Sequence, residues 1–101
     1  MAEKLMVNIT WHMHQPFYWN EEKGVFGFPW VRTHATKDYL FMGKLVERFP
    51  SLRVTFNFAP SLLRQFQLYL EGKEDMVMKL AKKEASTLSE EDKKLIRENF
   101  F

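Results

Sequence analysis

Residues 5–14, LMVNITWHMH, alternate between apolar and polar side chains, and this alternation decides the class of fold. Successive side chains of an extended chain point to opposite faces, so we expect a strand over residues 5–12 with one apolar and one mostly polar face. The apolar face would carry Leu5, Val7, Ile9 and Trp11, and the opposite face Met6, Asn8, Thr10 and His12.

The same two-faced pattern returns in residues 53–61, RVTFNFAPS, which predict a second strand. Val54, Phe56 and Phe58 share its apolar face, and Asn57 ends its polar face. At that position Asn57 would either order a loop or contact a ligand.

A long loop and a helix join the two predicted strands. The loop covers about residues 15–32, and its length suggests that it has a function. The helix is expected from Thr33 or His34 to Phe49, where Pro50 ends it. Its apolar side, read from helical spacing, would consist of Leu40, Phe41, Leu45, Val46 and Phe49.

Three more helices are expected after the second strand. Pro60 and Ser61 open the first, which Gly72 ends. A second covers roughly residues 74–84, and a third follows Ser89, which is the candidate N-terminal cap.

The order of these elements predicts an α/β fold. A strand–helix–strand unit of this length implies parallel strands joined by a crossover. In a β/α barrel one strand face meets the helices and the other fills the interior, whereas a doubly wound sheet has two apolar faces. The polar strand faces therefore favour the barrel.

Two strands cannot close a barrel, and the chain stops at residues 97–101, RENFF, within a predicted helix. We therefore expect residues 1–101 to form a single incomplete domain. It would be the N-terminal portion of a catalytic β/α barrel, with the order β-α-β followed by helices.

Composition narrows the class of protein further. The 101 residues are 46% hydrophobic and 28% charged with a net charge of +2, which suggests neither a nucleic acid nor a membrane partner. The absence of cysteine excludes a disulfide scaffold and a thiolate metal site. No apolar run resembles a signal peptide or a bilayer span, so we expect a cytoplasmic location.

The carboxyl ends of the predicted strands, where β/α barrels place their active sites, carry the candidate site residues. His12 and His14 share the polar face there and are suited to bind hydroxyl groups, since neutral imidazole offers one donor and one acceptor. Two other readings stay open: a pair of metal ligands, or a hydrogen-bonded pair in the core. The metal reading needs another ligand, and neither strand end carries a carboxylate.

Six aromatic residues fall between Phe17 and Trp30. Phe26 and Phe28 are expected in the core. Tyr18, Trp19 and Trp30 are better candidates for stacking on a sugar, because each joins a flat apolar face to a polar edge. Arg32 and His34 follow at the junction of loop and helix.

Three segments in order resemble the N-terminal part of glycoside hydrolase family 57. They are WHMHQPFY at 11–18, FPWVRTHATKDYLFM at 28–42 and TFNFAPSLLRQFQLYLEG at 55–72. The family contains α-amylases, amylopullulanases, 4-α-glucanotransferases and glucan branching enzymes. The resemblance implies an incomplete (β/α)7 barrel and a retaining mechanism on α-glucans, with no metal and no cofactor.

The resemblance also implies roles for particular residues. The catalytic glutamate and aspartate of the family belong to later segments, so no catalytic residue is assigned in this chain. His14-Gln15-Pro16 looks like the first signature region, in which His14 would line a sugar subsite. The candidate substrate-binding residues are His12, His14, Gln15, Trp30, Arg32, His34 and Asn57.

Two rival functions remain. One is part of a metal-dependent polysaccharide deacetylase, and the other is a non-catalytic carbohydrate-binding module. For the 101-residue chain itself we expect no hydrolysis, and we expect self-association through exposed barrel edges.

Overall fold

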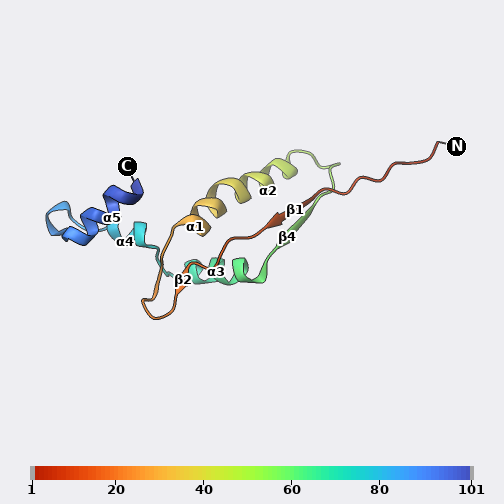
Figure 1. The fold of residues 1–101 in the computed structure, drawn as a ribbon. Coiled ribbons are helices and arrows are strands. Elements are labelled where there is room, and N and C mark those ends of the chain that lie inside the picture. Colours follow the sequence, from red (N-terminus) through yellow and green to blue (C-terminus); the bar gives the residue numbers. More distant parts are fainter. Residues whose placement is uncertain (1, 101) are drawn as a thin grey trace.

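Two parallel strands, β1 (Thr10–Met13) and β4 (Thr55–Phe58), form the centre of the structure. The computed structural model describes residues 2–100 and extends over 73 × 27 × 22 Å. In the register of the pair, Trp11 lies opposite Phe56 and His12 opposite Asn57. The parallel pair with its helices confirms the predicted α/β class, whereas closure into a barrel and the extent of the domain stay predictions (Figure 1).

Strand β1 begins at Thr10, later than the predicted range of residues 5–12. Pairing begins where the Thr55 amide donates to the Ile9 carbonyl, 3.0 Å away, and residues before Ile9 run beyond the start of β4 (Figure 1). Leu5 is consequently 89% exposed. Alternation identified the extended chain correctly, but the length of the strand depends on a partner distant in sequence.

A continuous helical segment connects β1 to β4 and runs beside them (Figure 1). It consists of α1 (Trp30–His34), a π-helical turn (Ala35–Tyr39) and α2 (Leu40–Glu47). It thus begins three or four positions earlier than predicted, directly after Pro29.

The predicted apolar side of that helix is partly wrong. Leu40 and Phe41 are 50% and 58% exposed, while Tyr39 and Met42 pack against the core. A π turn adds a residue to the helical turn and rotates everything after it by about 100°. The predicted residues all follow this turn; of them Leu45 and Val46 are half-buried, whereas Leu40, Phe41 and Phe49 are exposed.

The later helices agree with the predictions in their order. Helix α3 (Pro60–Leu70) ends at Gly72, whose φ is +88°, with Gly72 N–H donating to Tyr69 O and Lys73 N–H to Leu68 O. This is a Schellman ending, which favours glycine. Helix α4 (Met76–Ala81) is shorter than the predicted 74–84, and a 3₁₀ turn (Ala85–Thr87) follows it.

The last helix, α5 (Glu90–Phe100), confirms Ser89 as its cap. The Ser89 hydroxyl accepts from the Asp92 amide at 3.0 Å, and the Asp92 carboxylate accepts from the Ser89 amide at 3.1 Å. This reciprocal pair is a capping box, here with aspartate at its third position. In residues 2–100, none of the helices combines the length and the apolar character needed to cross a membrane.

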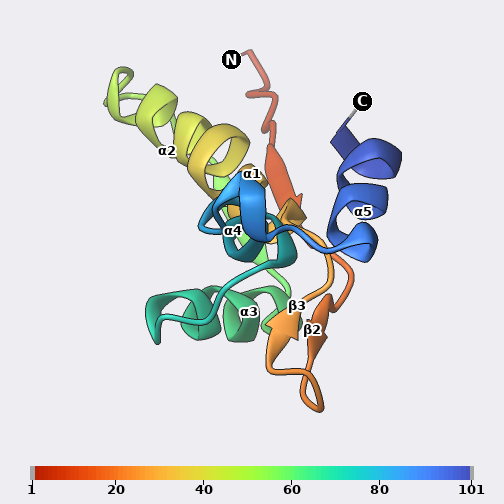
Figure 2. The same ribbon diagram turned by 90° about the vertical axis from the view of Figure 1, so that its left-hand side faces the viewer.

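The long loop between β1 and α1 contains an antiparallel hairpin, β2 (Trp19–Asn20) and β3 (Val25–Phe26), that was not predicted. Gly24 turns it with a φ of +59°. The Phe26 amide also donates to Glu74 O at 3.1 Å, which fixes the hairpin to the segment before α4 (Figure 2).

The core lies on the apolar face of the β1–β4 pair. Met13 from β1, Val31 from α1 and Leu62 from α3 are buried together there. The helices therefore cover one strand face, and the other face carries the polar side chains, as the alternation predicted.

Candidate functional site

The polar face of the strand pair brings together three of the predicted site residues. The His12 Nδ1 lies 2.5 Å from the Asn57 Oδ1, across paired positions of β1 and β4. The His14 ring stacks over the His12 ring with centroids 6.1 Å apart and planes 12° apart. All three side chains are exposed, so they form an open polar surface at the strand ends.

The residue after His14 is held by a tyrosine from the π turn. The Gln15 Nε2 donates to the Tyr39 hydroxyl at 3.1 Å, and that hydroxyl lies 3.4 Å from the His14 carbonyl oxygen, to which it donates. Tyr39 thereby ties Gln15 and the His14 backbone to the helix that follows.

The segment after Gln15 is held from the other side by Gln65 of α3. The Gln65 side chain is fully buried; its Nε2 donates to Pro16 O at 3.0 Å, and its Oε1 accepts from Tyr18 N–H at 2.8 Å. One amide group thus satisfies two backbone groups on either side of Phe17 and fixes the path of the chain there.

His34 lies close to this arrangement without joining the strand-end pair. Its Nδ1 is 2.6 Å from the Asp38 carboxylate, and its ring stacks on Tyr39 at 6.0 Å. His34 therefore contacts the same tyrosine that holds Gln15.

Arg32 takes part in a buried network instead. Its Nε donates to the Asp75 carboxylate at 2.7 Å, and Asp75 is fully buried. The Tyr69 hydroxyl and the Met78 amide also donate to Asp75, at 3.1 Å and 2.8 Å. Arg32 thus joins α1 to the start of α4.

Protonation in this network follows from its contacts. Burial by itself would raise the pKa of Asp75, but the hydrogen bonds from Arg32 and the Met78 amide, with the charge of Arg32, hold that pKa below its ordinary value. Burial, reinforced by the adjacent Asp75 charge, raises the pKa of Tyr69. Asp75 is therefore ionised and Tyr69 protonated near neutral pH.

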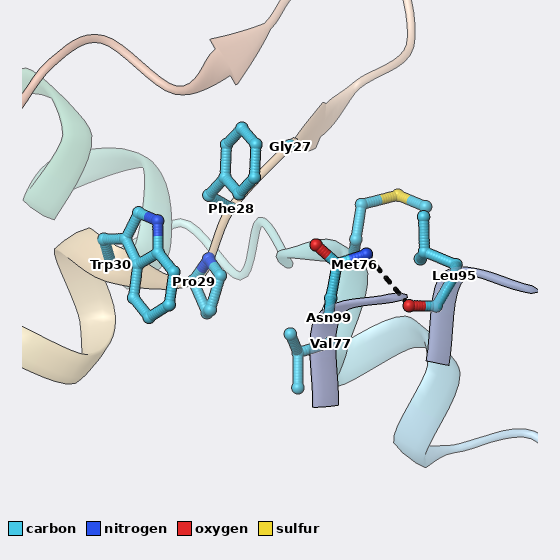
Figure 3. Close-up of a pocket in the computed structure, with 8 residues that line it drawn as sticks. All are labelled: Gly27, Phe28, Pro29, Trp30, Met76, Val77, Leu95 and Asn99. Atoms are coloured by element: carbon cyan, nitrogen blue, oxygen red, sulfur yellow. Dashed lines mark hydrogen bonds between the residues drawn. The ribbon is translucent and has the colours of Figure 1, made fainter. Parts of the chain in front are cut away.

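Trp30 lines a separate, largely apolar pocket of about 300 Å³ at the start of α1 (Figure 3). The segment from β3 to α1 forms one wall, and α4 and α5 form the other (Figure 3). The lining residues are Gly27, Phe28, Pro29, Trp30, Met76, Val77, Leu95 and Asn99. Phe28 is 48% exposed, so the prediction that it belongs to the core is wrong, whereas Phe26 is fully buried as predicted.

Comparison with known families identifies the chain. The family model described as glycosyl hydrolase family 57 matches residues 8–98. The chain belongs to glycosyl hydrolase family 57. Comparison with curated proteins and with solved structures finds no significant match.

Because the chain belongs to family 57, we consider which of the predicted residues could bind a glycoside. The predicted residues fall into three places: His12, His14 and Asn57 on the strand ends, Gln15 and His34 around Tyr39, and Arg32 and Trp30 in the network and the pocket. The first place offers ring nitrogens and an amide to hydroxyl groups. Among residues 2–100, no three histidine, aspartate or glutamate side chains are grouped to hold a metal ion.

Three residues whose hydrogen bonds or ion pairs hold the predicted site residues or their backbone in place were not predicted: Tyr39, Gln65 and Asp75. Gln65 and Asp75 are polar residues with fully buried side chains. The other buried residues of α3 are Leu62 and Leu68, so Gln65 is a polar residue on the buried face of the helix. Its position between these two leucines could have indicated its buried role from the sequence.

Proposed function

We propose that this chain supplies part of the sugar-binding surface of a retaining glycoside hydrolase or transglycosylase that acts on α-glucans. The observation that carries the proposal is the pairing of His12 with Asn57, with His14 stacked beside it, on the exposed ends of parallel strands in a family 57 chain. Active sites of β/α barrels gather at this end of the strands.

The hydrogen bond to Asn57 defines what His12 offers to a ligand. A carboxamide oxygen only accepts, so the His12 Nδ1 carries a proton and donates to it. In the neutral ring the Nε2 is then an acceptor for a sugar hydroxyl. Asn57 acts as the orienting group, and His12 and His14 are the groups that contact the sugar.

His14 contributes by binding the transition state more tightly than the ground state. As positive charge develops on the sugar ring, the polarity of its hydroxyl groups increases and a hydrogen bond to His14 strengthens. The held positions of Gln15, Pro16 and Tyr18 keep the backbone around His14 in place before the substrate arrives.

Retention requires two carboxyl groups about 5–5.5 Å apart. The strand-end segments, residues 11–16 and 56–61, contain neither aspartate nor glutamate. The proposal therefore places the nucleophile and the acid/base in other segments of a larger (β/α)7 barrel. We call the complete barrel protein of this proposal the intact enzyme, in which the chain would supply the N-terminal portion.

The proposal is tested by following the anomeric products of maltoheptaose with proton NMR during reaction with the intact enzyme. We expect α-configured products to appear first, which is the signature of retention at an α-glucosidic bond. First products in the β configuration, or no cleavage of maltoheptaose, starch or pullulan, would contradict it. The 101-residue chain alone serves as the inactive control, and hydrolysis by this control would also contradict the proposal.

A further inference from the structure

A π turn, Ala35–Tyr39, interrupts the helix that connects β1 to β4. The Leu40 amide, directly after it, donates to the Ala35 carbonyl, five positions earlier in place of the usual four. Turns of this kind are rare and are found frequently at functional sites. The side chain whose direction depends on this turn is therefore a candidate for a functional role.

That side chain is Tyr39. It follows the buried Val31 by eight positions, which in a regular α-helix would put it about 80° around the helix axis from Val31, at about 100° per residue. The additional residue of the π turn reduces this offset to about 20°. Tyr39 consequently packs against the core cluster that contains Val31 and Met13.

The Tyr39 hydroxyl reaches the segment that carries His14. It accepts from the Gln15 Nε2 at 3.1 Å and donates to the His14 carbonyl oxygen at 3.4 Å. A hydroxyl group has one proton to donate and two lone pairs, so both bonds form together. Tyr39 therefore holds His14 by its backbone, and the exposed imidazole remains accessible to a ligand.

Two further rings fix Tyr39 itself. The His34 ring stacks on it with centroids 6.0 Å apart, and the Phe66 ring of α3 meets it edge-on at 6.3 Å and 70°. His34 is held in turn by the Asp38 carboxylate, 2.6 Å from its Nδ1. The position of the Tyr39 hydroxyl is thus set by α1, the π turn and α3.

We propose that Tyr39 is a positioning residue of the sugar subsite, which holds His14 in the place where it binds the transition state. This inference rests on the proposed function. A binding group that is already in place needs no reorganisation during the reaction, and a displacement of about 1 Å can cost about a hundredfold in rate. Gln15 and His34 act through Tyr39 in this arrangement, and neither needs to contact the sugar.

A double-mutant cycle in the intact enzyme tests the inference. Tyr39→Phe removes the hydroxyl and keeps the ring, so kcat/KM on maltoheptaose should fall about five- to tenfold. The loss should lie in kcat, with KM changed by less than about twofold, because the hydroxyl improves binding of the transition state. In the His14→Ala background the same substitution should have almost no effect, because Tyr39 acts through His14.

Tyr69→Phe is the matched control for stability. Tyr69 packs against the same core, but its hydroxyl donates to Asp75, at 3.1 Å. The variant should unfold at a lower urea concentration and keep kcat/KM within about twofold of the wild type, measured where circular dichroism shows it folded. A general loss of stability would lower the rate of both variants, whereas positioning lowers it only in Tyr39→Phe.

The contact itself can be measured in the 101-residue chain, without activity. In proton–nitrogen NMR spectra, Tyr39→Phe should shift the side-chain amide of Gln15 and also its backbone amide, which shares a peptide group with the His14 carbonyl. Tyr69→Phe should leave both resonances in place. Gln15 resonances that stay unchanged in Tyr39→Phe would contradict the inference.

Two kinetic results would also overturn the inference. One is the wild-type kcat/KM in a folded Tyr39→Phe enzyme, and the other is an equal loss from Tyr39→Phe with and without His14. In both results His14→Ala still lowers kcat/KM. A failure of the proposed function is distinguishable, because His14→Ala then keeps the wild-type kcat/KM, and the role of Tyr39 falls with it.

Discussion

His12 and Asn57 lie 45 positions apart in sequence and directly opposite each other in the parallel pair β1–β4, with the His12 Nδ1 2.5 Å from the Asn57 Oδ1. The register of two short strands thus orients an imidazole at the edge of the sheet. Because the contact fixes the protonated nitrogen, it also determines which nitrogen faces a ligand.

Replacing Asn57 with alanine should weaken catalysis by the intact enzyme without unfolding it. The variant loses one exposed hydrogen bond of about 1 kcal/mol, so we expect kcat/KM on maltoheptaose to fall about fivefold. Thr55→Ala, two positions earlier on the same face, is the matched control and should keep the wild-type value. Equal kcat/KM values in both variants would show that Asn57 does not orient His12 for the reaction.

Replacing the buried Gln65 with leucine should strongly destabilise the fold, even though an apolar residue would then occupy a buried position. The substitution leaves the Pro16 carbonyl and the Tyr18 amide without their partner, which costs about 2–4 kcal/mol of unfolding free energy. Urea unfolding measures this cost. Gln67→Leu, on the exposed side of the same helix, should change the unfolding free energy by less than about 0.5 kcal/mol. Similar values for the two variants would contradict the buried role of Gln65.

The Asp75 network should make stability depend on pH in the acid range. The pKa of Asp75 is lower in the folded chain than its ordinary value, so its contribution is complete above about pH 4 and is lost as the pH falls through the folded pKa. Asp75→Asn should lower the unfolding free energy by about 2–3 kcal/mol at pH 7 and flatten its decline toward acid. Urea unfolding between pH 2.5 and 7 checks this, and an unchanged acid slope in Asp75→Asn would refute it.

The isolated chain should associate with itself. In the described residues β1 and β4 pair only with each other, which leaves their outer edges open, and Leu5, Met6 and Val7 are 89%, 87% and 72% exposed. Light scattering should give a mass above 12.2 kDa that rises with concentration. Val7→Lys adds charge beside the edge and should reduce the association. A constant mass of 12.2 kDa at all concentrations would contradict this expectation.

Alternation and helical spacing correctly predicted the features that depend on residues close together in the sequence. The two-faced strands are confirmed, and so are the Gly72 ending of α3 and the Ser89 cap of α5. Each of these depends on a few neighbouring residues. The start of β1 was predicted incorrectly because it depends on where β4 begins, 45 positions later.

Sequence spacing predicted neither the π turn Ala35–Tyr39 nor all of the buried residues that follow it. Tyr39 and Met42 pack against the core while Phe41 is exposed, and no residue type signals a π turn. The β2–β3 hairpin is only two residues long in each strand, too short for a visible alternation.

The exposed residues of the candidate site could be predicted from the sequence, whereas the buried residues that hold the neighbouring segments in place could not. Strand parity places His12 and Asn57 on one face, and the structure confirms that placement. Gln65 meets Pro16 and Tyr18 across 49 and 47 positions, and Arg32 meets Asp75 across 43. Such partners become neighbours only when the helices pack, so single-sequence patterns do not pair them.

The most direct test of the proposed sugar subsite is the kcat/KM of His14→Ala in the intact enzyme with maltoheptaose. A histidine that binds the sugar more tightly in the transition state should cost about 10²-fold or more in kcat/KM when removed, with a fold that circular dichroism and urea unfolding find unchanged. His14 is exposed, so its truncation removes little packing. A folded His14→Ala enzyme with the wild-type kcat/KM would contradict the assignment of the strand-end histidines to a sugar subsite.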